Sequence, residues 1–237
     1  GGTVTPTSGR EKRAHVVPHA LTLEEIAATV EDYARAARNA IRAGFDGVQI
    51  HAANGYLIDQ FLRDSTNQRS DAYGGSIANS MRFRKDGTMA VVAEVGAART
   101  AVRLSPNGDA QGCIDNDHVH TFSAVAAMLN DFGLAFLELR EARADGSYQV
   151  RVSPAIRQIF KGPLVLNGDY TAQEAEAAVQ TGACDAVSFG RAFISNPDLP
   201  ARISAGAPLA EIIDARSHYF GGAHGYSDYV KMDGTPA

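Results

Sequence analysis

The chain has 237 residues, of which 45% are hydrophobic, so it is long enough to form a sizeable core. Its formal net charge is −5 and it has no run of Lys and Arg, so we expect no nucleic-acid partner. No apolar segment approaches the roughly 20 residues of a membrane-spanning helix, so we expect no membrane partner either.

The N-terminal segment and the cysteines indicate the compartment. The first 20 residues contain no apolar core of a signal peptide. Cys113 and Cys184 lack the spacing of metal ligands. We therefore expect a cytoplasmic protein with reduced thiols and no metal site.

Segments with helical and strand patterns alternate along the chain. The first helix begins at a capping box of Thr22 and Glu25 and ends before Gly44. An apolar helix is expected directly after residue 56, and others at residues 76–95, 118–129, 153–160 and 171–182. The last of these is expected to open with a second capping box, of Thr171 and Glu174. Strands are expected to centre on Val48, Val102, Leu137, Val165 and Val187. This alternation predicts parallel strands, and their short apolar runs predict that both faces of the sheet are buried.

Polar residues and glycines follow the C-terminal end of each expected strand. They are His51, Ser105, Arg140, Asn167 and Gly190. In a (β/α)8 barrel that edge is the catalytic face, and a doubly wound sheet also binds ligands there. No G-x-G-x-x-G follows a strand, which weakens the dinucleotide-binding alternative. Only about five strands are expected, whereas a closed barrel of this kind has eight, so we expect this chain to be part of the folded unit.

The segment after the first strand carries three hydrogen-bonding side chains, those of His51, Asn54 and Tyr56. They could simply form a turn or cap the following helix. However, "HAANGY" resembles the H-x-x-N-G-Y motif of the old yellow enzyme family of FMN-dependent ene-reductases. Other segments resemble the same family in the same order: "YLIDQFLRDSTNQRSDAYGGS", "VRLSP", "LNGDYT", "AVSFGRAFISNPDL" and "GGAHGYSDY".

This resemblance implies an α/β fold, a (β/α)8 TIM barrel with FMN at its C-terminal face. The chain, residues 1–237, would be the C-terminal portion of a single FMN-binding domain and would supply about strands 4 to 8. Strands 1 to 3 would be absent or lie on a partner chain. In this family NADPH or NADH reduces the flavin, which then passes hydride to an activated alkene such as an enone or a nitroalkene.

The resemblance also implies roles for the three motif residues. His51 and Asn54 would bind the substrate oxygen and stabilise the negative charge that develops there. Losing one such donor costs roughly 2.7–4 kcal/mol of transition-state stabilisation. A phenol keeps its proton at neutral pH, so Tyr56 would be the general acid that protonates the α-carbon. Phe220 would line the substrate site.

Six residues are implied to bind the cofactor: Arg103, Asn167, Gly168, Gly190, Arg191 and Tyr219. Arg103 would lie against the N1/O2 edge of the flavin and favour its reduced form, although a core ion pair is the alternative for a buried arginine. The glycines and Arg191 would hold the phosphate, although a simple turn and a surface arginine are the alternative. The family usually has Phe then Tyr where this chain has Tyr219 then Phe220.

Two other functions fit parts of the pattern. The chain could be a non-catalytic half-barrel, a fragment or subunit that needs its N-terminal complement. It could also be a phosphate-binding barrel that acts on a sugar phosphate. That alternative needs only the loops at Gly168 and Gly190, and it leaves His51, Asn54 and Tyr56 unexplained.

Overall fold

The computed structural model describes residues 3–4, 13–14, 17–141, 149–213, 215–218 and 222–236. The chain divides into two compact units. One unit is Leu21–Ser188, and the other combines Gly1–Ala20 with Phe189–Ala237. The predicted active-site motif and the sheet belong to the first unit.

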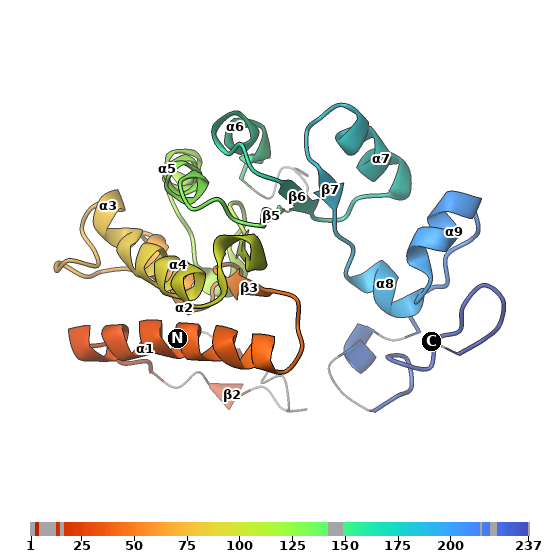
Figure 1. Cartoon of the computed structure of the whole chain (residues 1–237), viewed down its shortest axis with the longest axis horizontal. Coiled ribbons are helices and arrows are strands. Elements are labelled where there is room, and N and C mark those ends of the chain that lie inside the picture. Colours follow the sequence, from red (N-terminus) through yellow and green to blue (C-terminus); the bar gives the residue numbers. More distant parts are fainter. Residues whose placement is uncertain are drawn as a thin grey trace. The chain divides into compact units, whose positions relative to one another are not determined.

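The first unit is built on a five-stranded parallel sheet whose strands follow one another in chain order (Figure 1). The strands are β3 (Val48–His51), β4 (Thr100–Leu104), β5 (Phe136–Arg140), β6 (Leu164–Asn167) and β7 (Ala186–Val187). All five predicted strands are therefore confirmed. A doubly wound sheet reverses its strand order at a switch point, whereas consecutive order is that of a barrel wall.

Helices connect the strands and flank the sheet (Figure 1). They are α1 (Leu23–Arg42), α2 (Leu57–Leu62), α3 (Ile77–Ser80), α4 (Arg82–Val95), α5 (His118–Asn130), α6 (Ser153–Ile159) and α7 (Ala172–Gln180). The predicted capping box opens α1, since Glu25 N donates to Thr22 Oγ1 at 3.1 Å and Thr22 N donates to Glu25 Oε2 at 2.8 Å. A second predicted box, of Thr171 and Glu174, opens α7.

The two faces of the sheet differ, which corrects the expectation that both would be apolar and buried. One face carries Val102, Leu104, Leu137, Leu139 and Leu164, all fully buried in a core shared with α1, α4, α5 and α6. The alternate positions of the strands are mostly polar. They include Gln49, His51, Arg103, Glu138 and Asn167. Because side chains alternate along a strand, the helices cover the apolar face and the opposite face presents this polar set.

The second unit contains the segment that follows β7. It includes α8 (Arg191–Ser195), α9 (Leu199–Ala205), the 3-10 helix Ala215–His218 and a short antiparallel pair, β1 (Thr3–Val4) and β2 (Arg13–Ala14). Asp198 accepts hydrogen bonds from Arg202 and from the Met232 amide, and Arg202 donates to the Val230 carbonyl. These bonds attach the C-terminal segment to α9.

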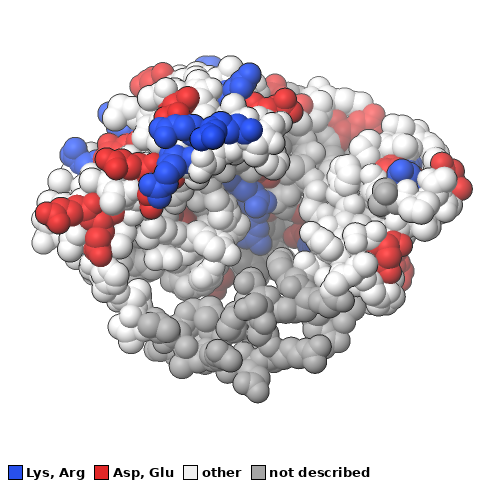
Figure 2. All heavy atoms as spheres, turned by 60° about the horizontal axis from the view of Figure 1, so that its bottom comes forward, with Lys and Arg blue, Asp and Glu red and all other residues white. Residues whose placement is uncertain are grey.

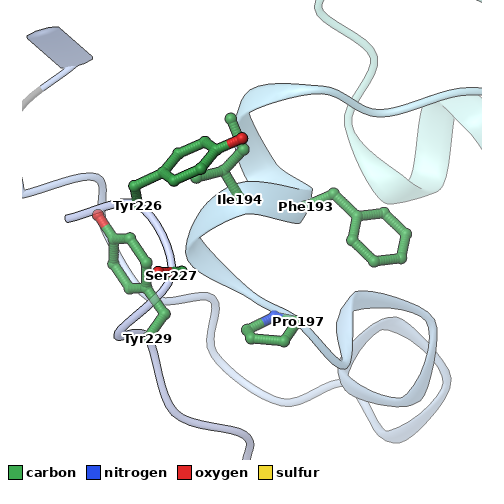
Figure 3. Close-up of a pocket in the computed structure, with 6 residues that line it drawn as sticks. All are labelled: Phe193, Ile194, Pro197, Tyr226, Ser227 and Tyr229. Atoms are coloured by element: carbon green, nitrogen blue, oxygen red, sulfur yellow. The ribbon is translucent and has the colours of Figure 1, made fainter. Parts of the chain in front are cut away.

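A mostly apolar pocket of about 340 Å³ lies in this second unit. Its lining residues come from α8, from the turn after it and from the C-terminal segment (Figure 3). They are Phe193, Ile194, Pro197, Tyr226, Ser227 and Tyr229. The Tyr229 hydroxyl accepts a hydrogen bond of 2.9 Å from the Ile213 amide, so this ring is fixed in the wall of the pocket.

On the face shown in Figure 2, Lys and Arg are interspersed with Asp and Glu among the residues that are not drawn in grey. No helix in the described part of the chain is long and apolar enough to cross a membrane.

Candidate active site

The turn after β3 places the three motif residues at the C-terminal edge of the sheet. Asn54 and Gly55 adopt left-handed backbone conformations, with φ of 57° and 75°. A Cβ atom at Gly55 would lie 2.5 Å from the carbonyl oxygen of Ala110, so only glycine fits there. This turn reverses the chain, and Tyr56 then becomes the N-cap residue of α2.

The buried ion pair of Asp59 and Arg63 stabilises this turn. The Asp59 carboxylate accepts 2.9 Å hydrogen bonds from the Gly55 amide and from Arg63 Nε. Arg63 also donates to the carbonyl oxygens of Ser105 and Pro106, just past β4. The Ser105 hydroxyl in turn accepts a 2.7 Å hydrogen bond from the Asn54 amide. The ends of β3 and β4 are thus connected through groups that water does not reach.

The three motif side chains keep their hydrogen-bonding groups available. The rings of His51 and Tyr56 lie 4.8 Å apart between centroids. Within the described ranges, neither ring nor the Asn54 side-chain amide has a hydrogen-bond partner. Tyr56 is 51% exposed, so a ligand can reach its hydroxyl. The arrangement therefore offers free donors at the edge of the sheet.

The surroundings of His51 favour its neutral form. Burial lowers its pKa below the ordinary 6.5, and the positive charge of Arg103 lowers it further, while Asp59 and Glu138 act in the opposite direction. A neutral imidazole has one N–H donor and one acceptor nitrogen. At pH 7, His51 can therefore donate one hydrogen bond to a ligand oxygen without carrying a full charge.

Arg103 is the centre of a polar network on the same face of the sheet. It pairs in register with His51 on one side and with Glu138 on the other. Its Nη2 donates to Asn167 Oδ1 at 3.0 Å, and its Nε lies 3.3 Å from Glu138 Oε1. The alternative of a core ion pair for Arg103 is thus partly observed.

Arg103 has N–H groups that could bind a flavin. Its buried Nε faces Glu138 at ion-pair distance but without hydrogen-bond geometry, and its Nη1 has no partner among the described residues. A buried N–H group without a partner costs free energy, so the arginine is suited to a further acceptor. The polar edge of a flavin ring offers such acceptors, and the residues present fit the group.

The residues expected at the phosphate differ in their surroundings. Gly168 has φ of 135°, and a Cβ atom there would overlap the Glu141 carbonyl oxygen. Close packing against the backbone just past β5 is therefore sufficient reason for this glycine. Both polar atoms of the Asn167 side chain have partners: Oδ1 accepts from Arg103, and Nδ2 donates to the Ser188 carbonyl. Gly190 and Arg191 begin α8 in the second unit. Tyr219 and Phe220 lie outside the described residues.

Sequence reasoning missed several residues that support the site. They are Gln49, Asp59, Arg63, Glu138 and Ser188. The alternation of Gln49 with His51, and of Glu138 with Arg140, was the available signal for a polar sheet face. Cys113 and Cys184 are buried and free, and no cluster of possible metal ligands occurs among the residues that the structure describes.

The sequence of this chain is similar to those of flavin-dependent oxidoreductases. Residues 3–210 match the model of the NADH:flavin oxidoreductase / NADH oxidase family. A Leishmania infantum protein described as a "Probable flavin mononucleotide-dependent alkene reductase" is 45% identical over 217 residues, which cover 91% of this chain and 59% of the relative.

Two solved structures are also similar. The old yellow enzyme homologue from Zymomonas mobilis has a TM-score of 0.92 and 50% identity, over 97% of this chain and 65% of that one. Morphinone reductase has a TM-score of 0.89 and 41% identity, over 94% of this chain and 60% of that one. The chain thus spans about three fifths of the length of these relatives.

Proposed function

Since the chain belongs to the NADH:flavin oxidoreductase / NADH oxidase family, we propose that it supplies the C-terminal part of an FMN-dependent ene-reductase. The substrates would be activated alkenes such as enones and nitroalkenes. When bound, FMN would carry hydride from NADPH or NADH to the alkene.

His51 and Asn54 would orient the substrate. Both offer free donors at the end of β3, and a carbonyl or nitro oxygen placed between them would accept two hydrogen bonds. Negative charge develops on that oxygen during reduction, and fixed donors stabilise it in the transition state. The Asp59–Arg63 pair maintains the turn that carries Asn54, so the donors are oriented before substrate arrives.

Tyr56 would complete the reaction as a general acid. Tyr56 is exposed, its ring lies beside that of His51, and its hydroxyl has no competing partner in the described part of the chain. The phenolic O–H bond would break as a C–H bond forms at the α-carbon of the substrate. Solvent would then return the proton to Tyr56.

The cofactor would be held by Arg103, Asn167, Gly168, Gly190, Arg191 and Tyr219, and Phe220 would bind the substrate. Arg103 would contact the polar edge of the flavin ring through Nη1, which has no partner among the described residues. Arg191 and the loops at the two glycines would hold the phosphate. This assignment rests on the family match and on the open donors of Arg103.

The cluster of available donors beside Arg103 is the observation that carries the proposal. It is tested by adding FMN and NADPH or NADH to the purified chain and following cyclohexenone-dependent oxidation of the nicotinamide. Bound oxidised flavin should give a visible absorption band. A colourless protein that binds no flavin, alone and with the remaining barrel strands supplied, would overturn the proposal.

A second candidate, the half-barrel that is inactive by itself, is favoured by two observations. The chain spans only 59–65% of the relatives compared above, and five strands do not close a barrel. The same assay separates the two. Activity only when the remaining strands are supplied supports this second candidate.

A further inference from the structure

Glu138 is a buried carboxylate in the centre of the polar sheet face. It belongs to the middle strand β5 and is 8% exposed. Gln49 Nε2 donates to its Oε2 at 2.6 Å, and the Ser188 hydroxyl donates to its Oε1 at 2.7 Å. Arg103 Nε lies 3.3 Å from Oε1. Side chains from β3, from β4 and from the end of β7 therefore converge on one carboxylate.

Gln49 and Ser188 fix the position of this carboxylate, but they bring no charge. Burying a carboxylate is costly unless a cation lies close to it. Arg103 is the only cation within ion-pair distance of Glu138 in the described part of the chain. The charges of these two side chains therefore offset one another.

We infer that Glu138 is a positioning residue, which fixes the guanidinium group of Arg103 and reduces its effective positive charge at the flavin site. The inference rests on the proposed function, because it takes Arg103 as a contact of the flavin ring. Two anchors hold Arg103: Asn167 on Nη2 and Glu138 beside Nε. Nη1 has no partner among the described residues, so it is the group left to contact the flavin ring.

This arrangement has a consequence for the redox balance of a bound flavin. A guanidinium group favours the two-electron-reduced, anionic form of the ring, and a neighbouring carboxylate weakens that preference. Glu138→Gln removes the negative charge but keeps the size of the side chain and an acceptor oxygen for Ser188. The variant should therefore bind reduced flavin more tightly relative to oxidised flavin.

The first measurement is the midpoint potential of FMN bound to the full chain, supplied with the remaining barrel strands if binding requires them. We expect the potential of Glu138→Gln to be more positive by about 30 mV, which corresponds to a tenfold change in the ratio of the two affinities for a two-electron couple. Glu138→Asp, which keeps the charge, should restore most of the original potential.

Glu141→Gln is the matched control. Glu141 is a buried carboxylate at the end of the same strand, but it accepts hydrogen bonds from the Val152 and Ser153 amides at the start of α6. This variant should lower stability and leave the potential unchanged. An equal shift in potential in the two Gln variants would overturn the inference.

The second measurement needs no flavin. Asp59, Arg103 and Glu138 are the charged groups that act on His51, and the Tyr56 ring lies beside it. Removing the charge of Glu138 should lower the midpoint of the His51 titration, followed by NMR of the imidazole. An unchanged midpoint would overturn the inference. If no variant binds flavin, the proposed function fails while this titration still decides the role of Glu138.

Discussion

The ring of Tyr56 lies 4.8 Å from the ring of His51, at an interplanar angle of 55°. The left-handed turn at Asn54 and Gly55 lies between these two residues, just past the end of β3. In the proposed reaction, the pair would combine a donor for a substrate oxygen with a phenol that protonates a neighbouring carbon.

Replacing Tyr56 with Phe should separate the two halves of the reaction. Reduction of FMN by the nicotinamide should continue, since it requires no proton from this side chain. Alkene reduction should fall by about 10²–10⁴-fold, the usual contribution of a general acid. Stopped-flow measurement of each half-reaction checks this expectation. Equal loss in both half-reactions would contradict the assigned role.

His51 should titrate below its ordinary value of 6.5, because burial and Arg103 disfavour its charged form. A pKa lowered by folding means that the unfolded chain binds the proton more tightly. The contribution of His51 to stability is therefore complete above pH 6.5 and is lost as the pH falls from 6.5 through the lower pKa of the folded protein. NMR titration of the imidazole measures the midpoint, and Arg103→Gln should raise it. A midpoint at or above 6.5 in the parent protein would refute the electrostatic account.

Arg191→Ala should weaken FMN binding, because a charge-assisted contact to a phosphate oxygen would be lost. Riboflavin lacks the phosphate, so its affinity should be low in the parent protein and unaffected by the substitution. Fluorescence titration with the two flavins gives the comparison. Equal affinity of the parent protein for FMN and riboflavin would exclude the loops at Gly168 and Gly190 as the phosphate site.

Arg84→Met should stabilise the protein. Arg84 is buried in α4, donates one long hydrogen bond of 3.4 Å to the Ala52 carbonyl, and has no partner for Nε and Nη1 among the described residues. Burial lowers its pKa to about 10. Replacing such a group with an apolar side chain of similar size should raise the free energy of unfolding by about 1–4 kcal/mol.

Arg63→Met is the matched comparison in urea denaturation. Arg63 is equally buried, but its guanidinium group pairs with Asp59, so its removal leaves a buried carboxylate without its closest cation. The free energy of unfolding should fall by about 3–5 kcal/mol. If both substitutions lowered the free energy of unfolding by a similar amount, Arg84 would contribute as much to stability as Arg63, contrary to this expectation.

The remaining strands of a barrel should restore flavin binding if the chain alone lacks it. Among the described residues, β3 and β7 each pair on one side only, so the sheet has two open edges. A polypeptide of roughly 110–150 residues would complete a barrel in the upper part of the usual size range. Co-expression, mass spectrometry and the flavin spectrum test this. A preparation of these 237 residues that binds no flavin alone, and still binds none after the remaining strands are supplied, would contradict it.

Local signals were sufficient for much of the fold. The capping boxes at Thr22 and Thr171 and the apolar centres of the five strands predicted the elements correctly, because each signal lies within one element. The polar character of one sheet face was not predicted, because isolated polar residues such as Gln49 lie within short segments that are otherwise apolar.

The candidate site was predictable only in part. The motif identified His51, Asn54 and Tyr56, which follow one another closely in sequence. The contact of Gln49 with Glu138 joins residues 89 positions apart, and the contact of Arg103 with Asn167 spans 64. Such pairs are set by the register of parallel strands, which local patterns in the sequence do not contain.

The location of the Asp59–Arg63 pair has a consequence for the response to salt. Dissolved ions screen charges that face water, over about 8 Å at physiological ionic strength, but act little on a pair that water does not reach. The exposed bridge between Arg38 of α1 and Glu94 of α4 should weaken as salt is added. The turn that carries Asn54 should keep its shape under the same conditions, since its supporting ions are 2% and 1% exposed. Orientation of the ligand would then persist at salt concentrations that already weaken the ion pair between α1 and α4.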